Sequence, residues 1–365
     1  MVSVTRSGPP FQGVVTADVT ISDGTAILGS DYGPLANNPV TVTFADGEGP
    51  TKTFTIPIID DGVFEADETV NLSIGSTTVL RPDGTTYEAE RPEGTPASAA
   101  VLTITNDEPC NPNPVVTDTT NNGLGSLRQM VLEACPNSIV EFALPLFSTP
   151  QTISLDTGGQ IVIDKNLTIN GPVAEATVQR STAGGTPNFR VFYVSPGNIV
   201  TINRLTIANG SVTGTFPTGF GAGVFNDQAT LTINNSIVRN NIAGGFGGGL
   251  YNSSGSLTVN STTIRNNSST SESGGGIGSR TTGGGSSLLN INNSTISGNS
   301  ALSGGGGGIF NSSVVGGLNA TATITNSTIS GNTALSAGGI GNLAVLGTTT
   351  LNLNNSTVAR NSGTS

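Results

Sequence analysis

The sequence contains no histidine and no tryptophan, and the first absence excludes whole classes of function. Without an imidazole, the chain can hold neither a histidine-ligated metal nor a catalytic histidine. Long apolar runs are also missing, because none approaches the roughly 20 residues that a membrane-spanning helix requires. The sequence therefore predicts no transmembrane segment and no imidazole chemistry.

Charge is scarce and unevenly distributed along the 365 residues, a length that allows two domains. Residues 1–109 carry a net charge of −12, whereas residues 110–365 carry a net charge of +1. An acidic surface repels nucleic acid and anionic membranes and attracts cations. We therefore expect the first segment to bind cations, and we expect no nucleic-acid partner.

Residues 1–109 are predicted to form an antiparallel β-sandwich. Short runs of alternating polarity are separated by Gly, Pro, Asp and Asn, which is typical of strands joined by turns. A polar, turn-rich stretch from Leu80 to Pro96 is expected to form an exposed hairpin or long loop. The candidate strands are VSVTR, VVTADVTI, VTVTF, KTFTIPI, TVNLSI and AVLTIT.

Five carboxylates lie within the short run from Ile59 to Glu68, IDDGVFEADE, and no Lys or Arg lies among them. Like charges at close range raise one another's pKa or recruit a cation. Further acids, such as Asp31 and Asp107, also fall next to strand ends, and connections at one end of a sandwich cluster in space. Oxygen ligands at this density are typical of Ca²⁺ sites. An acidic rim that binds no specific ion is the alternative.

The first segment resembles the Calx-beta family over nearly its whole length. The matching pieces are DGTAILGSDY, VTFADGE, IIDDGVFEADETVNLSI and LTITNDE, in this order. The resemblance implies an immunoglobulin-like sandwich that binds Ca²⁺ at one end. The ligands that it implies are the side chains of Asp31, Asp60, Asp61, Glu65, Glu68, Asp107 and Glu108, with the backbone carbonyl of Val63.

Three positions depart from the family pattern. Gly62 replaces a third Asp, Asn106 replaces another common acid, and a Glu of the first strand would lie before Met1. We therefore expect one or two ions rather than four, with an affinity on the order of 10⁻⁴ M as in extracellular modules. Asp67 is expected to point away from the site.

Residues 110–138 are predicted to be a linker followed by a capping segment. Ser126 is a candidate N-cap, LRQMVLEA has helical spacing, and Pro136 ends the helix. The stretch resembles the opening segment that precedes β-helical repeats in bacterial surface proteins, which implies a lid over the first coil. Because Cys110 and Cys135 flank this stretch, a disulfide would pin the lid. The alternatives are two unrelated thiols and an ordinary amphipathic helix.

Residues 139–365 contain a repeat with a period near 30, which predicts a solenoid of stacked coils with about three short strands each. Ile, Val and Leu are expected to point inward, and Thr, Ser and Asn outward. The segment resembles right-handed parallel β-helix proteins of the pectate-lyase-like class and bacterial outer-surface repeat proteins. Repeat units begin at Val200, Thr230, Ser256, Leu288, Thr321 and Leu351.

Asparagine recurs at the expected corners of the coils, where it tolerates left-handed backbone and bonds neighbouring groups. We interpret these residues as ladders along the axis, although several also lie in Asn-x-Ser/Thr strings that resemble glycosylation acceptors. One predicted column holds Asn235, Asn293, Asn326 and Asn355. The second holds Asn240, Asn266, Asn299, Asn332 and Asn361.

The repeat region offers little catalytic chemistry, because only Asp227 and Glu272 are acidic from residue 196 onward. Arg204, Arg239 and Arg265 occur at similar repeat positions and either form a weak contact for anionic glycans or simply aid solubility. We therefore expect a non-enzymatic protein in which a calcium-binding sandwich joins a β-helical stalk for adhesion or surface display. The alternative is a β-helix that binds or cleaves polysaccharides.

The expected location is extracellular, at the cell surface of a bacterium and associated with its outer membrane. Surface glycans or other cell-surface proteins are the expected partners beside calcium. No signal peptide is recognisable after Met1, and both ends of the sequence fall inside repeating structure, so we interpret the chain as a fragment of a longer protein.

Overall fold

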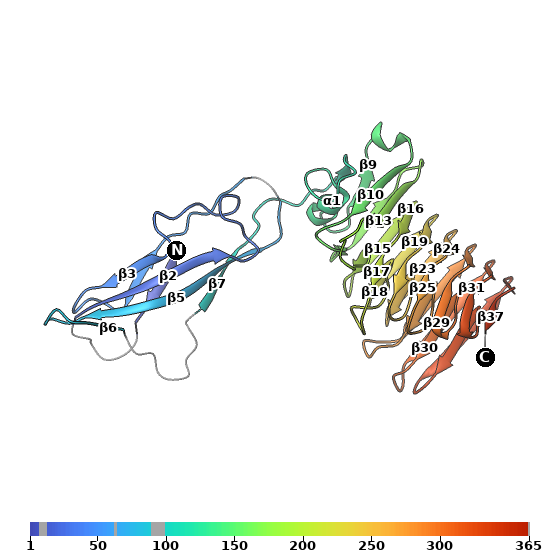
Figure 1. The fold of residues 1–365 in the computed structure, drawn as a ribbon. Coiled ribbons are helices and arrows are strands. Elements are labelled where there is room, and N and C mark those ends of the chain that lie inside the picture. The colour runs from blue at the N-terminus through green and yellow to red at the C-terminus, as the bar shows by residue number, and fades with distance from the viewer. Residues whose placement is uncertain (7–12, 62–63, 89–98, 364–365) are drawn as a thin grey trace. The chain divides into compact units, whose positions relative to one another are not determined.

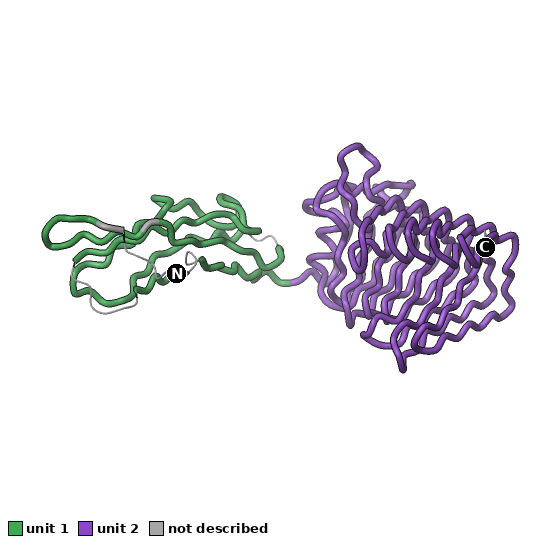
Figure 2. The backbone as a smooth tube through the Cα atoms, turned by 60° about the horizontal axis from the view of Figure 1, so that its bottom comes forward, with its two compact units in different colours: residues 1–109 green, residues 110–365 purple. Residues whose placement is uncertain are grey.

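The computed structural model of the chain describes residues 1–6, 13–61, 64–88 and 99–363. It consists of two compact units, Met1–Pro109 and Cys110–Ser365 (Figure 2). The first unit contains antiparallel sheets, the second is a parallel β-helix, and the described residues include one α-helix. The predicted all-β fold class is therefore confirmed.

Two antiparallel sheets form the first unit (Figure 1). The smaller sheet pairs β1 (Val2–Thr5) with β4 (Thr51–Phe54). The larger sheet has the order β3 (Val40–Phe44), β2 (Val14–Asp23), β5 (Glu68–Leu80) and β6 (Thr86–Glu88), and β7 (Ala99–Ile104) also pairs with β5. Alternate residues of both sheets, including Val4, Val19 and Phe44, pack into one core.

Strand β5 is longer than the sequence predicted. The run TVNLSI was expected to be a whole strand, but β5 continues to Leu80 and turns into β6, with Leu80 opposite Thr86. The expected hairpin after Leu80 is thus present as far as residue 88, and the rest of that stretch to Pro96 lies outside the described residues. The extension arises because GSTTVL can pair with Val14–Ala17 of β2.

A short helix, α1 (Leu127–Glu133), covers the start of the second unit. The Ser126 hydroxyl accepts a hydrogen bond from the Gln129 N–H, which caps the helix as expected. Leu127, Met130 and Val131 are buried against the first coils. A disulfide joins Cys110 to Cys135 directly after the helix. A short 3-10 turn, Leu146–Ser148, follows the strand Ile139–Phe142.

Four parallel sheets run along the β-helix (Figure 1). The first sheet comprises β8 (Val115–Val116), β9 (Ile139–Phe142), β12 (Leu167–Asn170), β15 (Ile199–Asn203), β19 (Thr230–Asn234), β23 (Ser256–Asn260), β27 (Ser287–Asn292), β31 (Asn319–Thr325) and β35 (Thr348–Asn354). The second comprises β10 (Gln151–Leu155), β13 (Ala176–Arg180), β16 (Leu205–Ala208), β20 (Ile237–Arg239), β24 (Thr263–Arg265), β28 (Thr295–Ser297), β32 (Thr328–Ser330) and β36 (Thr357–Ala359).

The third sheet comprises β11 (Ile161–Ile163), β14 (Phe192–Val194), β18 (Val224–Asp227), β22 (Leu250–Ser253), β26 (Ile277–Arg280), β30 (Ile309–Ser313) and β34 (Ile340–Ala344). The fourth comprises β17 (Ser211–Val212), β21 (Ile242–Ala243), β25 (Ser268–Ser269), β29 (Ser300–Gly305), β33 (Thr333–Ser336) and β37 (Ser362–Gly363). About three strands per coil were expected, so this fourth, mostly very short strand is a correction.

Inward-pointing Ile, Leu and Val residues from successive coils stack into one continuous core, as the alternation predicted. The register differs from the sequence layout at two repeats. Thr230 lies opposite Ile199 rather than Val200, and Thr321 lies opposite Thr350 rather than Leu351. Stacking in register keeps the inward residues of neighbouring coils in contact, because each coil can bury its inner face only against its neighbours.

The first predicted asparagine column is a row of left-handed corners. Asn235, Asn293, Asn326 and Asn355 all have φ between 49° and 53°. The second predicted column is wrong by one residue at two coils, because Asn240 and Asn266 are also left-handed corners. The amide ladder instead runs through Asn241, Asn267, Asn299, Asn332 and Asn361, with each Nδ2 donating to the next Oδ1 at 2.9–3.0 Å.

The predicted arginine column is also incomplete. Arg239 and Arg265 lie opposite each other on β20 and β24, but the residue before them in that column is Ala208. Arg204 occupies a left-handed corner instead, with φ 52°. Its guanidinium donates to the Gly171 carbonyl and to Asn170 Oδ1, which fastens the corner to the preceding coil.

Replacing Cys110 and Cys135 together by serine is expected to destabilise the capped end of the β-helix by about 3 kcal/mol. The disulfide closes a loop of 25 residues, and its removal frees that loop in the unfolded chain. Denaturant unfolding of the double variant and the oxidised parent checks this value. A parent that loses no stability on reduction would contradict a fastening role for the bond.

Candidate metal centre

The loops at one end of the sandwich enclose a pocket of about 360 Å³. Met1 and the start and end of the 58–68 segment contribute to its wall, together with the residues that follow β7. Val63, whose carbonyl was a predicted ligand, lies outside the described residues, as does Gly62. The other seven predicted ligands all line the pocket: Asp31, Asp60, Asp61, Glu65, Glu68, Asp107 and Glu108.

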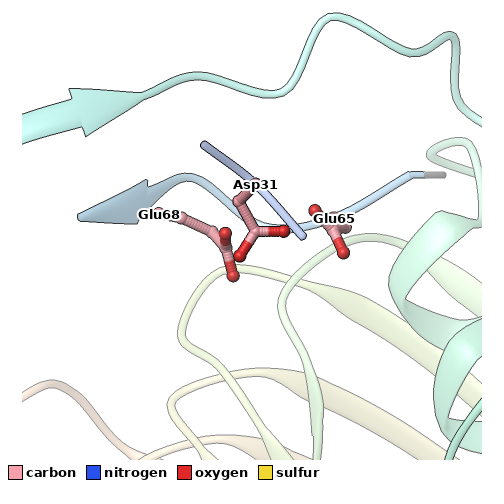
Figure 3. Close-up of side chains that lie close together, drawn as sticks. All are labelled: Asp31, Glu65 and Glu68. Carbon is pink, nitrogen blue, oxygen red and sulfur yellow. The ribbon is translucent and has the colours of Figure 1, made fainter. Parts of the chain in front are cut away.

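Three of these carboxylates form a tight group (Figure 3). Oxygen atoms of Asp31, Glu65 and Glu68 all lie within 4.8 Å of one another. Asp31 is buried, Glu65 lies in the loop before β5, and Glu68 is the first residue of that strand. Asp60, Asp61, Asp107 and Glu108 line the same pocket, but the structure does not bring them into this group.

Backbone contacts hold Asp31 in place. Its own N–H donates to the Ile27 carbonyl at 3.0 Å, and the Ile27 N–H donates to Asp31 Oδ2 at 2.6 Å. The Asp31 carbonyl accepts from the Ile59 N–H at 3.1 Å, which ties the turn to the segment that carries Asp60 and Asp61. The GSDY turn is therefore fixed beside the acidic run, although 29 residues separate Asp31 from Asp60.

Asn106 holds the backbone of Glu65 and of Glu108 in the pocket, a role that the sequence did not reveal. Its Oδ1 accepts from the Glu65 N–H at 3.1 Å, and its Nδ2 donates to the Glu108 carbonyl at 3.1 Å. Its own N–H donates to Asp67 Oδ1 at 3.2 Å, and Asp67 is exposed and does not line the pocket. The only signal was Asn106 standing where related sequences carry an acid, which was interpreted as a lost ligand.

The carboxylates of the pocket repel one another electrostatically. Burial, a hydrogen bond with Asp31 and the charges of Asp31 and Glu65 raise the pKa of Glu68 to about 7 from its usual 4.5. Burial and the charges of Asp31, Asp61 and Glu108 raise the pKa of Glu65 as well. No Lys or Arg is among the described residues that line the pocket, so no side chain of the wall offsets these charges.

The donor set fits a hard divalent cation. Glu68 Oε2 is buried and has no hydrogen-bond partner among the described residues, which leaves an acceptor available in the acidic group. Several carboxylate oxygens on loops match the ligands and flexibility of Ca²⁺ sites. Asp31, Glu65 and Glu68 are the residues that would hold the ion, and Asp60, Asp61, Asp107 and Glu108 line the same pocket.

In the presence of a chelator, the sandwich is expected to become more stable as the pH falls from about 8 to about 5. The folded pKa of Glu68 lies above its usual 4.5, so the folded state binds more protons than the unfolded state between these values. Stability is therefore lost as the pH rises through about 7. Denaturant unfolding at both pH values measures the effect, which should be smaller in a Glu68→Gln variant because only the raised pKa of Glu65 remains.

Comparison with known proteins agrees with this geometry for the first unit. Residues 1–107 match the Calx-beta domain family, so this part of the chain is a Calx-beta domain. No curated protein matches the chain. Among the described residues, no helix combines the length and the apolar character needed to cross a membrane. The family match covers the sandwich alone, so a function for the β-helix has to be argued from the residues of the β-helix.

Proposed function

We propose that the chain is a non-enzymatic surface protein whose calcium-binding sandwich is joined to a β-helical stalk for adhesion or display. The observation that supports calcium most strongly is the group formed by Asp31, Glu65 and Glu68, in which a buried carboxylate oxygen has no hydrogen-bond partner among the described residues. A bound Ca²⁺ supplies positive charge that offsets these carboxylates. The family to which the sandwich belongs supports the same ion.

Three chain segments contribute carboxylates to the pocket that holds this centre. Asp31 comes from the turn before residue 33, Glu65 and Glu68 from the segment that enters β5, and Glu108 from the segment that leaves β7. The first two segments carry like charges at close range, so they repel each other when nothing neutralises them. Occupation of the centre therefore stiffens this end of the sandwich, which suits a mechanical role outside the cell.

A scaffold role for the later coils is supported by how few acids they carry, because only Asp227 and Glu272 are acidic from residue 196 onward. Asp227 Oδ2 accepts a hydrogen bond from the Tyr193 hydroxyl at 2.7 Å, and its other oxygen accepts from Gln228 at 3.3 Å. Glu272 precedes β26, two strands further along the third sheet. Acid–base cleavage of a glycosidic bond requires two carboxyl groups that face one substrate. The alternative function is binding or cleavage of polysaccharides.

An extracellular, surface-associated location is part of the proposal, with surface glycans or other surface proteins as partners. The disulfide between Cys110 and Cys135 suits an oxidising compartment. A stack of coils with an amide ladder is stiff, and its outward face is dominated by Thr, Ser and Asn. Such a surface suits contact with other molecules in water.

Incubation of the full chain with pectate, alginate and neutral polysaccharides, with and without Ca²⁺, tests the non-enzymatic part. We expect no release of reducing ends and no unsaturated products. Sustained product formation that disappears in an Asp227→Asn variant would favour the alternative enzyme. Binding without cleavage would agree with the adhesion role.

A further inference from the structure

Two arginines stand side by side on the outer face of the second sheet. Arg239 of β20 lies opposite Arg265 of β24, and the residues before them, Val238 and Ile264, are buried in the core. Because side chains alternate along a strand, both arginines point outward, and neighbouring strands lie about 4.8 Å apart. Both guanidinium groups therefore extend from the same face of two adjacent coils.

The repeat argues against solubility as the reason for these charges. A charge that only aids solubility is best dispersed over the surface, since adjacent like charges repel each other. Here the two charges occupy consecutive coils, while the rest of their column is small and uncharged. From β16 to β36, the other residues of that column are Ala208, Ser297, Ser330 and Ala359. The column therefore concentrates positive charge in one place, which favours attraction of an anion.

No acid compensates this pair within the described part of the chain. The side chains of Arg239 and Arg265 make no hydrogen bond or ion pair with any described residue. The acids of the later coils belong to another sheet, because Asp227 ends β18 and Glu272 lies in the segment before β26. The positive charge of the pair is thus left to solvent or to a ligand.

Uncommitted hydrogen-bond donors surround the two arginines. Asn240 and Asn266 follow them at exposed left-handed corners, and Ser297 lies opposite Arg265 on the next coil. The side chains of these three residues make no hydrogen bond with the described residues. The outward asparagines of the first sheet differ, because Asn260 Nδ2 donates to Asn234 Oδ1 at 2.8 Å. We call this group the arginine patch: Arg239, Asn240, Arg265, Asn266 and Ser297.

We propose that the arginine patch binds the acidic groups of an anionic polysaccharide, an inference that rests on the glycan partner of the proposed function. A guanidinium is a forked donor that matches the oxygens of a carboxylate or a sulfate ester. Such oxygens can replace the water that satisfies the donors of the free patch. Binding an anion also offsets the repulsion between Arg239 and Arg265.

The openness of the patch favours a polymer over a small anion. Arg265 and the two asparagine corners are exposed, so they do not enclose a ligand. A chain that carries several acidic groups gains affinity from repeated weak contacts, whereas a single ion makes only one. The net charge of −12 on residues 1–109 repels a densely charged polymer such as DNA. A polysaccharide with widely spaced acidic groups therefore fits best.

Surface plasmon resonance of the full chain over immobilised dextran, lightly carboxymethylated dextran, lightly sulfated dextran and duplex DNA tests this patch, in calcium-free buffer of low salt. The three dextrans share one backbone, so they isolate the acidic group and distinguish carboxylate from sulfate. We expect saturable binding to at least one charged dextran and none to plain dextran. Replacing both Arg239 and Arg265 by glutamine should weaken that binding at least about tenfold, as expected for loss of two charge-assisted contacts.

Two further double variants separate recognition from general attraction. Arg81→Gln with Arg360→Gln removes the same charge from exposed positions outside the patch and should bind like the parent. Arg239→Lys with Arg265→Lys keeps the charge but loses the fork, so it should bind with intermediate strength. Equal weakening in the two glutamine variants, or DNA binding as tight as that of the charged dextrans, would overturn the proposal.

Failure of the patch is distinguishable from failure of the proposed function. Absence of binding to both charged dextrans would overturn the patch. Binding of pectate, alginate or neutral polysaccharides that is unchanged when Arg239 and Arg265 are both glutamine would also overturn the patch, while it would leave the glycan partner of the proposed function in place. Absence of binding to every polysaccharide would overturn both.

Discussion

Replacement of Asn299 by alanine is expected to destabilise the β-helix by about 3–5 kcal/mol, the cost of leaving several buried polar groups unpaired. Asn299 is 0 % exposed. Its Oδ1 accepts from both the backbone N–H and the Nδ2 of Asn267, and its Nδ2 donates to Asn332 Oδ1 and to the Ile264 carbonyl. The change therefore interrupts the amide ladder in the middle of the stack. Denaturant unfolding of the parent and the variant measures the loss.

Asn290→Ala is the matched control. Asn290 lies on the outer face of β27, in the same coil as Asn299, and its side chain makes no hydrogen bond with the described residues. We expect a change within about 0.5 kcal/mol, as for ordinary surface substitutions. Equal losses in the two variants would contradict a stabilising role for the amide ladder.

Calcium is expected to stabilise the sandwich by about 2.7 kcal/mol when its free concentration is about 100 times the dissociation constant. If that constant is on the order of 10⁻⁴ M, about 10 mM Ca²⁺ suffices. A Glu68→Gln variant should show two changes of opposite sign. In chelator it should be more stable than the parent at pH 8, because a charge of raised pKa is removed from the group. Added calcium should raise the free energy of unfolding of this variant only slightly.

Thermal unfolding of the full chain in chelator and in calcium, followed at the sandwich transition, measures both changes. Magnesium at equal concentration is the control, because it prefers six ligands in a strict octahedron and releases its waters reluctantly. Equal stabilisation by both ions, or by calcium in Glu68→Gln as in the parent, would show that the stabilisation comes from general screening of charge.

The fold was largely predictable because its periodicities are strong. Alternating polarity identified the strands, and a repeat near 30 residues identified the stacked coils. Positions within a repeat were harder to assign, because Asn240 and Asn241 are adjacent and chemically identical in the sequence. Only the backbone distinguishes them, since Asn240 has φ 57° while Asn241 is buried in the ladder. Arg204 was placed in the wrong column for another reason, because it corresponds to the corner residue Asn235 of the next coil and not to Arg239.

The candidate metal centre was predictable in composition but not in geometry. The family resemblance indicated the acidic residues that line the pocket, yet a sequence cannot show which of them approach closely. Asp31, Glu65 and Glu68 do so because the Asp31 carbonyl accepts from Ile59 and because Asn106 holds the Glu65 backbone.

Calorimetric titration of the full chain with Ca²⁺, beside Asp31→Asn and Asp67→Asn, tests calcium binding most directly. Both substitutions remove one charge and keep an oxygen that can accept the existing backbone hydrogen bond from Ile27 or Asn106. Saturable binding by the parent and by Asp67→Asn, weakened at least about tenfold in Asp31→Asn, is the predicted result. Equal weakening in the two variants, or no saturable binding by the parent in the millimolar range, would contradict a calcium centre built on Asp31, Glu65 and Glu68.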